Sequence, residues 1–231
     1  MYKGCKFLAI IPARGGSKGI PNKNIIDVEG RSLIDYTIKE ALASKYLDSV
    51  IVSTDSLEIS RIAVECGASV PFLRPKELAS DESRTIDALL HTIKNLSQQG
   101  LNYDYLVLLQ PTQPLRKSFH IDESIEKIVS VGEETLVSVS RVTEHPILMR
   151  SVDNKGILKS LLNKDSTIRR QDFPEYYKVN GAIYINKINV NLNEETSLND
   201  NRLPYIMDSI YDVDIDEPID LEIFKMLVSK Y

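Results

Sequence analysis

The 231-residue sequence predicts an α/β fold in which helices flank a mostly parallel sheet. Short apolar runs alternate along the chain with stretches whose apolar residues recur every three or four positions, as strands alternate with crossover helices in parallel sheets. The first run, residues 7–11, is apolar without alternation, which is typical of a strand buried on both faces. The length suits one large domain, or one domain with an insertion.

Each expected element has a local signal. The expected strands are residues 7–11, 50–54, 69–73, 105–109, 135–140, 179–185 and 212–216. We place 105–109, the most apolar of them, at the centre of the sheet. The expected helices begin near residues 32, 57, 84, 118 and 218. Ser32 and Asp35 have the spacing of a capping box, and residues 54–56 can cap the second helix.

The last two elements are predicted from alternation and from proline. Residues 212–216 read Asp-Val-Asp-Ile-Asp, so three carboxylates share one face of the expected strand. Pro218 suits the first turn of the final helix. The residues of this helix that we expect to face inward are Ile219, Ile223, Met226 and Leu227.

From about residue 145 to residue 176 the alternation of strands and helices breaks. Residues 153–156 (Asp-Asn-Lys-Gly) make a good hairpin turn between short apolar pieces. We therefore expect a single domain, 1–231, that carries 145–176 as an inserted β-arm.

Composition limits the class of protein. Hydrophobic residues make up 42% and charged residues 26%, as in ordinary globular domains, and the net charge of −5 speaks against a nucleic-acid-binding protein. Cys5 and Cys66 lack the CxxC spacing of a zinc site, and two cysteines do not make a disulfide framework. No apolar run reaches the length of about 18 residues that a membrane span needs. We expect a cytoplasmic protein without a membrane or nucleic-acid partner.

The loop after the first strand concentrates positive charge and glycine. Gly15, Gly16 and Gly19 are interleaved with Arg14, Ser17, Lys18, Lys23 and Asn24. Glycine lets backbone N–H groups approach a ligand, and successive N–H groups can form an anion-binding nest. The loop has neither the P-loop spacing nor G-x-G-x-x-G. It predicts a polyphosphate site of another kind, and a solvated basic loop is the alternative.

Two other segments are expected near this loop. Gln110 follows the strand 105–109, and ligands of open parallel sheets lie beyond the carboxyl ends of the strands, so Arg14 and Gln110 belong to the same rim. Asp214 and Asp216 project together and offer the carboxylate oxygens that Mg²⁺ prefers. The alternative for these aspartates is an acidic edge strand that faces water.

Six motifs carry a resemblance to a known family. They are IIPARGGSKGIPNKN (10–24), VSTD (52–55), LRPKELASD (73–81), LLQPTQPLR (108–116), NGAIYI (180–185) and DVDID (212–216). In this order they resemble the acylneuraminate cytidylyltransferases, also called CMP-sialic acid synthetases. The resemblance covers nearly the whole chain. It implies a Rossmann-like fold of the nucleotide-diphospho-sugar transferase type and a homodimer, with the inserted arm at the dimer interface.

The resemblance also implies a reaction and its residues. CTP and a nine-carbon 2-keto acid sugar would give a CMP-sugar and pyrophosphate, with Mg²⁺ as cofactor. The implied catalytic residues are Arg14, Lys23, Asp214 and Asp216, and the last two would bind the metal. The implied nucleotide-binding residues are Arg14, Gly15, Gly16, Ser17, Lys18, Lys23, Asn24, Arg74 and Thr85. The implied sugar-binding residues are Gln110, Arg170, Lys178, Asn180 and Tyr184.

Two departures from the family, and one position that differs among its members, bear on the sugar. Lys178 stands where arginine is common, and Ile147 and Leu148 stand where some sialate-specific members carry lysine after His-Pro. Pseudaminate activators tend to have arginine at the position of Gly19. N-acetylneuraminate and legionaminate are therefore the leading substrates, and pseudaminate ranks third. The rival functions are a GT-A-like glycosyltransferase that uses a sugar nucleotide, and a non-catalytic nucleotide-sensing module.

Overall fold

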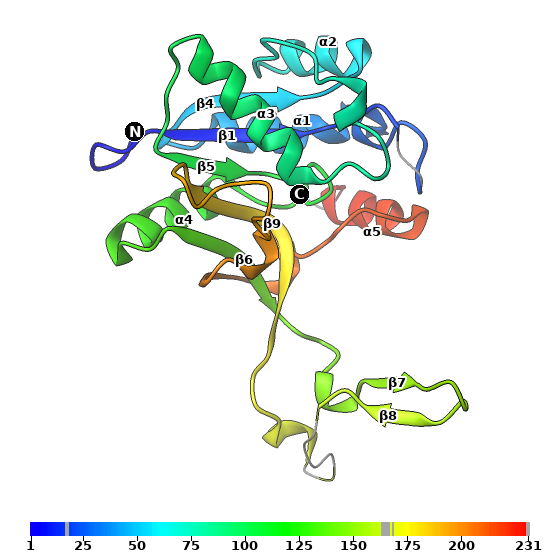
Figure 1. Ribbon diagram of the computed structural model, residues 1–231. Helices are drawn as coiled ribbons and strands as arrows, with labels where there is room; N and C mark the ends of the chain where they lie inside the picture. The colour runs from blue at the N-terminus through cyan, green and yellow to red at the C-terminus, as the bar shows by residue number, and fades with distance from the viewer. Residues whose placement is uncertain (17–18, 163–166, 168, 230–231) are drawn as a thin grey trace.

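A six-stranded sheet forms the centre of the protein (Figure 1). The computed structural model describes residues 1–16, 19–162, 167 and 169–229. The strands, in spatial order, are β10 (Leu203–Met207), β6 (Thr135–Arg141), β9 (Tyr177–Lys187), β5 (Tyr105–Leu108), β1 (Phe7–Pro12) and β4 (Leu47–Ser53). Neighbours are parallel except at β9, which runs antiparallel to both β5 and β6. The predicted mostly parallel α/β fold is confirmed, with β5 in an interior position of the sheet.

The described chain contains five α-helices, of which the first four cover the sheet and the last packs against a separate core. They are α1 (Leu33–Leu42), α2 (Leu57–Glu65), α3 (Thr85–Gln98), α4 (Ser118–Val131) and α5 (Pro218–Val228). Alternate residues of β1 face opposite layers: Phe7 belongs to the core packed by α1, α2 and α4, and Leu8 to the core packed by α3. Both are fully buried, as expected for a strand covered on both faces. No helix in the described part of the chain is long and apolar enough to cross a membrane.

The helix starts match the expected positions, but the caps differ. Ser56 caps α2 as predicted, because its Oγ accepts a hydrogen bond from the N–H of Ile59 at 3.3 Å. The capping box predicted for α1 is wrong: Ser32 makes no side-chain cap hydrogen bond. Asp35 instead pairs with Lys39 one turn later, at 2.9 Å.

The predicted strand at 212–216 is wrong, and the edge strand β10 was not predicted. Residues 212–216 form an irregular segment that follows a short 3₁₀ turn, Ser209–Tyr211. β10 holds the sheet edge beside β6, and Pro204, which has no N–H to donate, is tolerated there because the strand has a partner on one side only. The expected strand 69–73 is reduced to one bridge between Ser69 and Ile51.

Helix α5 begins at Pro218 as predicted, but it packs through a different face. Leu221 and Phe224 are buried, and the Phe224 ring lies edge-on to Tyr36 at 5.1 Å. Ile219 and Met226 are more than 60% exposed, so their predicted inward orientation is wrong. Because α5 carries apolar residues on more than one face, periodicity alone did not select the buried one.

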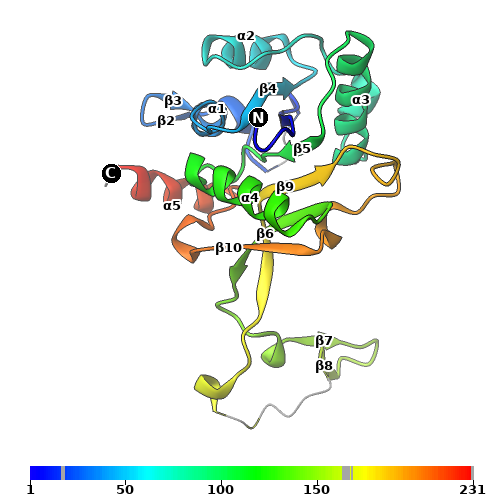
Figure 2. The same ribbon diagram turned by 90° about the vertical axis from the view of Figure 1, so that its left-hand side faces the viewer.

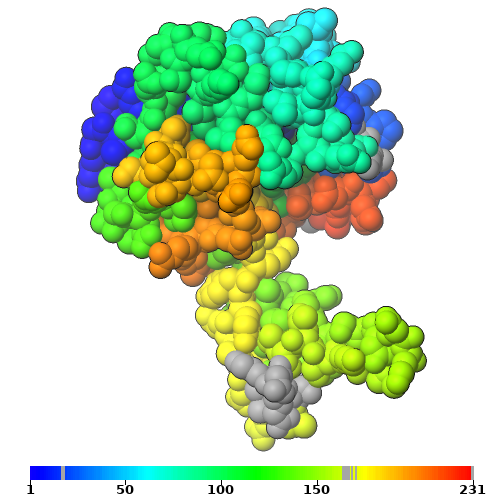
Figure 3. All heavy atoms as spheres, viewed as in Figure 1, coloured from blue at the N-terminus to red at the C-terminus, as the bar shows by residue number. Residues whose placement is uncertain are grey.

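The predicted hairpin exists and stands away from the sheet. Strands β7 (Arg150–Val152) and β8 (Leu158–Ser160) pair antiparallel, and Gly156 has the positive φ of 76° that the turn requires. Figures 1 and 2 show the hairpin below the body, joined to it only by the ends of β6 and β9, and the same projection is visible in the space-filling view (Figure 3). A second small hairpin, β2 (Asp27–Val28) with β3 (Arg31–Ser32), precedes α1.

Candidate active site

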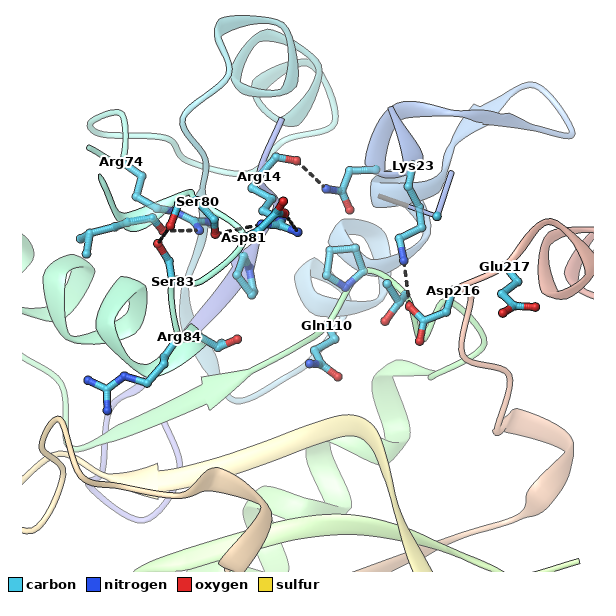
Figure 4. A pocket seen from close by; sticks show the side chains of 17 residues that line it. Arg14, Lys23, Arg74, Ser80, Asp81, Ser83, Arg84, Gln110, Asp216 and Glu217 are labelled. Carbon is cyan, nitrogen blue, oxygen red and sulfur yellow. Dashed lines mark hydrogen bonds and ion pairs between the residues drawn. The ribbon is translucent and has the colours of Figure 1, made fainter. Parts of the chain in front are cut away.

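A pocket of about 580 Å³ opens at the carboxyl ends of β1 and β5 (Figure 4). It is lined by Pro12, Arg14, Gly19, Lys23, Asn24, Arg74, Leu78, Ser80, Asp81, Ser83, Arg84, Thr85, Gln110, Pro111, Thr112, Asp216 and Glu217. β1 and β5 are parallel neighbours, so the loops that follow them emerge at one edge of the sheet. The start of the chain, its middle and its last segment therefore meet in one cavity.

Two cations of the loop after β1 face this pocket and are held by acidic or carbonyl partners. Arg14 pairs through Nη2 with Asp81 at 2.8 Å, and its Nη1 donates to the carbonyl of Ser80 at 2.9 Å. Lys23 donates from Nζ to the carbonyl of Ile215 at 2.7 Å and pairs with Asp216 at 2.9 Å. The Lys23–Asp216 contact joins residues 193 positions apart. An anionic ligand that binds Arg14 or Lys23 would therefore compete with Asp81 or Asp216 for these cations.

Arg74 is buried behind the pocket. Its Nε donates to Ser53 Oγ at 3.2 Å, its Nη2 donates to the Ser53 carbonyl, and its Nη1 donates to the carbonyl of Leu78 at 3.3 Å. Burial lowers the pKa of Arg74, and the nearby carboxylate of Asp55 acts in the opposite direction. Because three of its N–H donors bind protein groups, Arg74 fastens the start of the 74–85 connection to the end of β4.

The glycines of the loop differ in their surroundings. The N–H of Gly15 already donates to Asp55 Oδ1 at 2.9 Å, whereas Gly16 has open space around it. A Cβ on Gly19 would lie 2.3 Å from the backbone oxygen of Asp216, which is closer than real side chains approach. Ser17 and Lys18, predicted nucleotide ligands, lie outside the described residues. Asn24 supports the loop by donating from Nδ2 to the Arg14 carbonyl at 3.0 Å.

The three aspartates of segment 212–216 have different environments. Asp212 pairs with Lys178 at 3.0 Å and its side chain is only 6% exposed. Asp214 has its pKa raised, chiefly by desolvation and further by the negative charge of Asp216, while a hydrogen bond from Thr112 lowers it. Asp216 lines the pocket beside Lys23. Asp216 thus lines the pocket, and Asp214 lies close enough for the two negative charges to interact.

The donors present suit Mg²⁺. Among the described residues no group of three or more histidine, cysteine, aspartate or glutamate side chains is arranged to hold a metal by itself. Mg²⁺ commonly binds through one or two carboxylates together with phosphate oxygens and water. Asp214 and Asp216 match the carboxylate part of such a site. Phosphate oxygens of a ligand in the adjoining pocket, which carries arginine and lysine, and water would supply the rest.

A second pocket of about 450 Å³ adjoins the first, because Arg84, Thr85 and Gln110 line both. Its other lining residues are Ile86, Leu108, Tyr184, Glu194, Glu195, Thr196, Ser197, Leu198 and Asn199. Tyr184 donates from Oη to Asn199 Oδ1 at 3.0 Å and so links β9 to the 194–199 loop. The sequence did not indicate that this loop lines the site, because a polar, asparagine-rich connection carries no motif.

Three of the predicted sugar ligands do not line either pocket. Asn180 is 4% exposed, accepts from Ser138 Oγ at 2.5 Å and donates to Ser140 Oγ at 2.9 Å. Lys178 is engaged with Asp212. The backbone of Arg170 begins a 3₁₀ turn in the arm, Arg170–Asp172. Gln110 and Tyr184 do line the second pocket.

Comparison with known proteins now decides the family. A family model described as "Cytidylyltransferase" matches residues 8–229. The chain belongs to the cytidylyltransferase family. This cytidylyltransferase is 38% identical, over 96% of both chains, to the CMP-N,N'-diacetyllegionaminic acid synthase of Legionella pneumophila. It is 37% identical to the N-acylneuraminate cytidylyltransferase of Streptococcus agalactiae, over 91% of its own length and 50% of the relative, so it spans about half of that protein.

The fold agrees with that family. A solved structure of CMP:2-keto-3-deoxy-manno-octonic acid synthetase complexed with CTP superposes on this cytidylyltransferase with a TM-score of 0.73 and covers 97% of it. The identity of that pair is 16%, so the likeness concerns the fold alone. The resemblance first indicated by the six motifs is confirmed.

Proposed function

We propose that this cytidylyltransferase transfers CMP from CTP to a nine-carbon 2-keto acid sugar of the legionaminate or N-acetylneuraminate type and releases pyrophosphate. The observation that carries the proposal is the meeting of Arg14 and Lys23 with Asp216 in one pocket. A triphosphate needs this combination of cations and a carboxylate for its metal ion. The 38% identity to a legionaminate-activating relative supports the choice of acceptor.

In this reaction the anomeric hydroxyl oxygen of the sugar attacks the α-phosphorus of CTP. A new P–O bond forms, the bond to the β-phosphate breaks, and the hydroxyl proton is released. Arg14 and Lys23 bind the phosphates, together with Gly15 and Gly16 of the same loop. Transfers of this kind depend mainly on positioning and charge stabilisation. Mg²⁺, bound by Asp214 and Asp216, would neutralise phosphate charge and increase the acidity of the attacking hydroxyl.

The remaining roles divide between the two pockets. Asn24, Arg74 and Thr85 serve the cytidine, and the loop residues Ser17 and Lys18 belong to the phosphate cradle. Gln110 and Tyr184, which line the second pocket, bind the sugar. Lys178 and Asn180 reach the sugar side only if their present contacts with Asp212 and with Ser138 and Ser140 rearrange when substrates bind. Arg170 acts from the arm.

The same proposal includes a homodimer held by the arm, 145–176. Val152 and Leu158 pair across the hairpin and are 66% and 65% exposed. A two-stranded hairpin is at best marginally stable alone in water, so another surface must cover it. Sedimentation would test this: Leu158→Asp should shift the protein to monomer, and Ser151→Asp, on the other face of the hairpin, should not. A wild-type monomer at micromolar concentration would refute it.

A pyrophosphate-release assay tests the reaction. CTP and Mg²⁺ are offered with N-acetylneuraminate, legionaminate or pseudaminate, and we expect turnover to be fastest with one of the first two. Binding of CTP without release of pyrophosphate from any of them would favour a nucleotide-sensing module. Turnover of a CMP-sugar with an acceptor, and none of CTP, would favour a glycosyltransferase. We place this reaction in the cytoplasm, where CTP is available.

A further inference from the structure

Arg116 is a fully buried cation that donates to the backbone of Gln110, a residue of both pockets. Its side chain is 1% exposed, and it is the largest of the fully buried side chains. Nη1 donates to the carbonyl of Ala182 at 2.8 Å and more weakly to the carbonyl of Gln110 at 3.4 Å. Nε and Nη2 have no acceptor among the described residues, and no carboxylate there forms an ion pair with the guanidinium.

Burying a guanidinium without a paired carboxylate costs free energy of folding, so the site would favour an apolar side chain if Arg116 only filled space. A buried charge without a paired carboxylate loses its hydration and regains little, and apolar residues of similar volume often stabilise a core better. Burial lowers the pKa of Arg116 to about 9, which still leaves the guanidinium charged at neutral pH. A buried cation at this place needs a reason other than stability.

The two carbonyls that Arg116 binds belong to a residue that lines the site and to the strand beside it. Gln110 lies two residues beyond the end of β5 and lines both pockets, and Ala182 lies in β9 next to Gly181. Gly181 has φ of 79°, and a Cβ there would lie 2.6 Å from Gln110 Oε1. The Gln110 side chain therefore rests against the backbone of Gly181, and Arg116 joins the two backbone segments by donating to a carbonyl of each. Thr112, two residues further on, accepts from the N–H of Ile215 at 2.9 Å.

We infer that Arg116 is a positioning residue for the acid-sugar side of the site, acting through Gln110. The inference rests on the proposed function, since it concerns the second substrate of that reaction. Arg14 and Lys23 lie on the other side of the first pocket, in the loop after β1, and Arg116 makes no contact with them. Loss of Arg116 therefore weakens recognition of the sugar and leaves recognition of CTP intact.

The experiment compares Arg116→Met and Arg116→Lys with wild type. Arg61→Met is the matched control, because Arg61 is exposed on α2, has Glu65 as its one ion-pair partner among the described residues and lines neither pocket. Arg116→Met should raise the KM for the acid sugar about tenfold and change the KM for CTP less than about twofold, as expected for loss of a charged hydrogen bond. Arg116→Lys should raise the sugar KM only about threefold, since an ammonium can still donate to the carbonyls.

Hydrogen–deuterium exchange gives a readout without turnover. The Gln113 amide, which donates to the Gln110 carbonyl at 3.3 Å, should exchange faster in both Arg116 variants than in Arg61→Met. A lower melting temperature with both KM values unchanged, or with equal rises in both, would overturn the inference and leave Arg116 a structural residue. If Arg116→Met does not fold, Arg116→Lys decides by the same criteria. If wild type releases no pyrophosphate, the proposed function fails, and unchanged exchange at Gln113 separately refutes the role of Arg116.

Discussion

Gly19 offers the sharpest test of how the ends of the chain build one pocket. A Cβ at this position would lie 2.3 Å from the backbone oxygen of Asp216 and 3.5 Å from its carbonyl carbon. The nearest obstacle is backbone, so no side-chain rotation relieves the contact. Gly19→Ala must therefore push the loop after β1 away from the segment that carries Asp214 and Asp216.

The size of the movement follows from the contact distance. Real Cβ atoms essentially never approach a heavy atom closer than 3.0 Å, so the two segments must separate by at least 3.0 − 2.3, or about 0.7 Å. A displacement of about 1 Å in a catalytic arrangement can cost on the order of 100-fold in rate. We expect Gly19→Ala to lower kcat/KM by roughly 30- to 100-fold. Stability should change little, because Gly19 is exposed and lies outside helices and strands.

The assay is pyrophosphate release from CTP with the preferred acid sugar, and Gly16→Ala is the control. A Cβ on Gly16 meets nothing within 4 Å, so this variant makes the same chemical change in the same loop without the clash. Alanine keeps the backbone N–H through which Gly16 would bind phosphate, so this variant should keep at least half of the wild-type activity. Equal activities for Gly19→Ala and wild type would refute the claim that the two segments are held at their present separation, and equal losses in both variants would show that loop flexibility is what matters.

Three further predictions address charge. Asp216→Asn should lower kcat by about 10²–10³ and raise the Mg²⁺ concentration needed for half-maximal rate, measured by titrating Mg²⁺ after treatment with EDTA; an unchanged Mg²⁺ dependence would exclude Asp216 as a ligand. His120 is buried and desolvation lowers its pKa to about 4, so the unfolded state takes up a proton first as pH falls. The free energy of unfolding should therefore decrease by up to about 3 kcal/mol between pH 6.5 and 4, and His120→Gln should flatten that part of the pH profile of chemical denaturation. Lys178→Met leaves the buried Asp212 without its cation and should cost about 1 kcal/mol, since Lys178 itself is half exposed; in a double-mutant cycle with Asp212→Asn the losses should not add.

The sequence predicted most of the fold because its strongest signals are local. The runs that became β1 and β5 are continuously apolar, and Ser56 and Pro218 have roles that follow from their own chemistry. The errors occurred where tertiary context decides. Segment 212–216 alternates like a strand, but β10 already holds the place beside β6 at the sheet edge.

The site was predicted in outline and not in detail. Parallel strands bring their carboxyl ends to one edge, so the neighbourhood of Arg14 and Gln110 followed from topology. The pairing of Arg14 with Asp81, and of Lys178 with Asp212, depends on side-chain positions that no spacing rule supplies. Asn199 was missed for the same reason, since only the folded loop brings it to Tyr184.

The contacts that join the two ends of the chain are made largely by backbone groups. The Ile215 N–H donates to the Thr112 carbonyl, the Ile215 carbonyl accepts from Lys23 Nζ, and the Asp216 carbonyl lies against Gly19. Any residue other than proline presents these N–H and C=O groups, so the sequence of 212–216 cannot reveal that they are used. The site should therefore tolerate changes of side chain at Ile215 that preserve its buried volume, and lose activity when the segment changes length, because an added residue moves Asp214 and Asp216 relative to Lys23 while every side chain remains present.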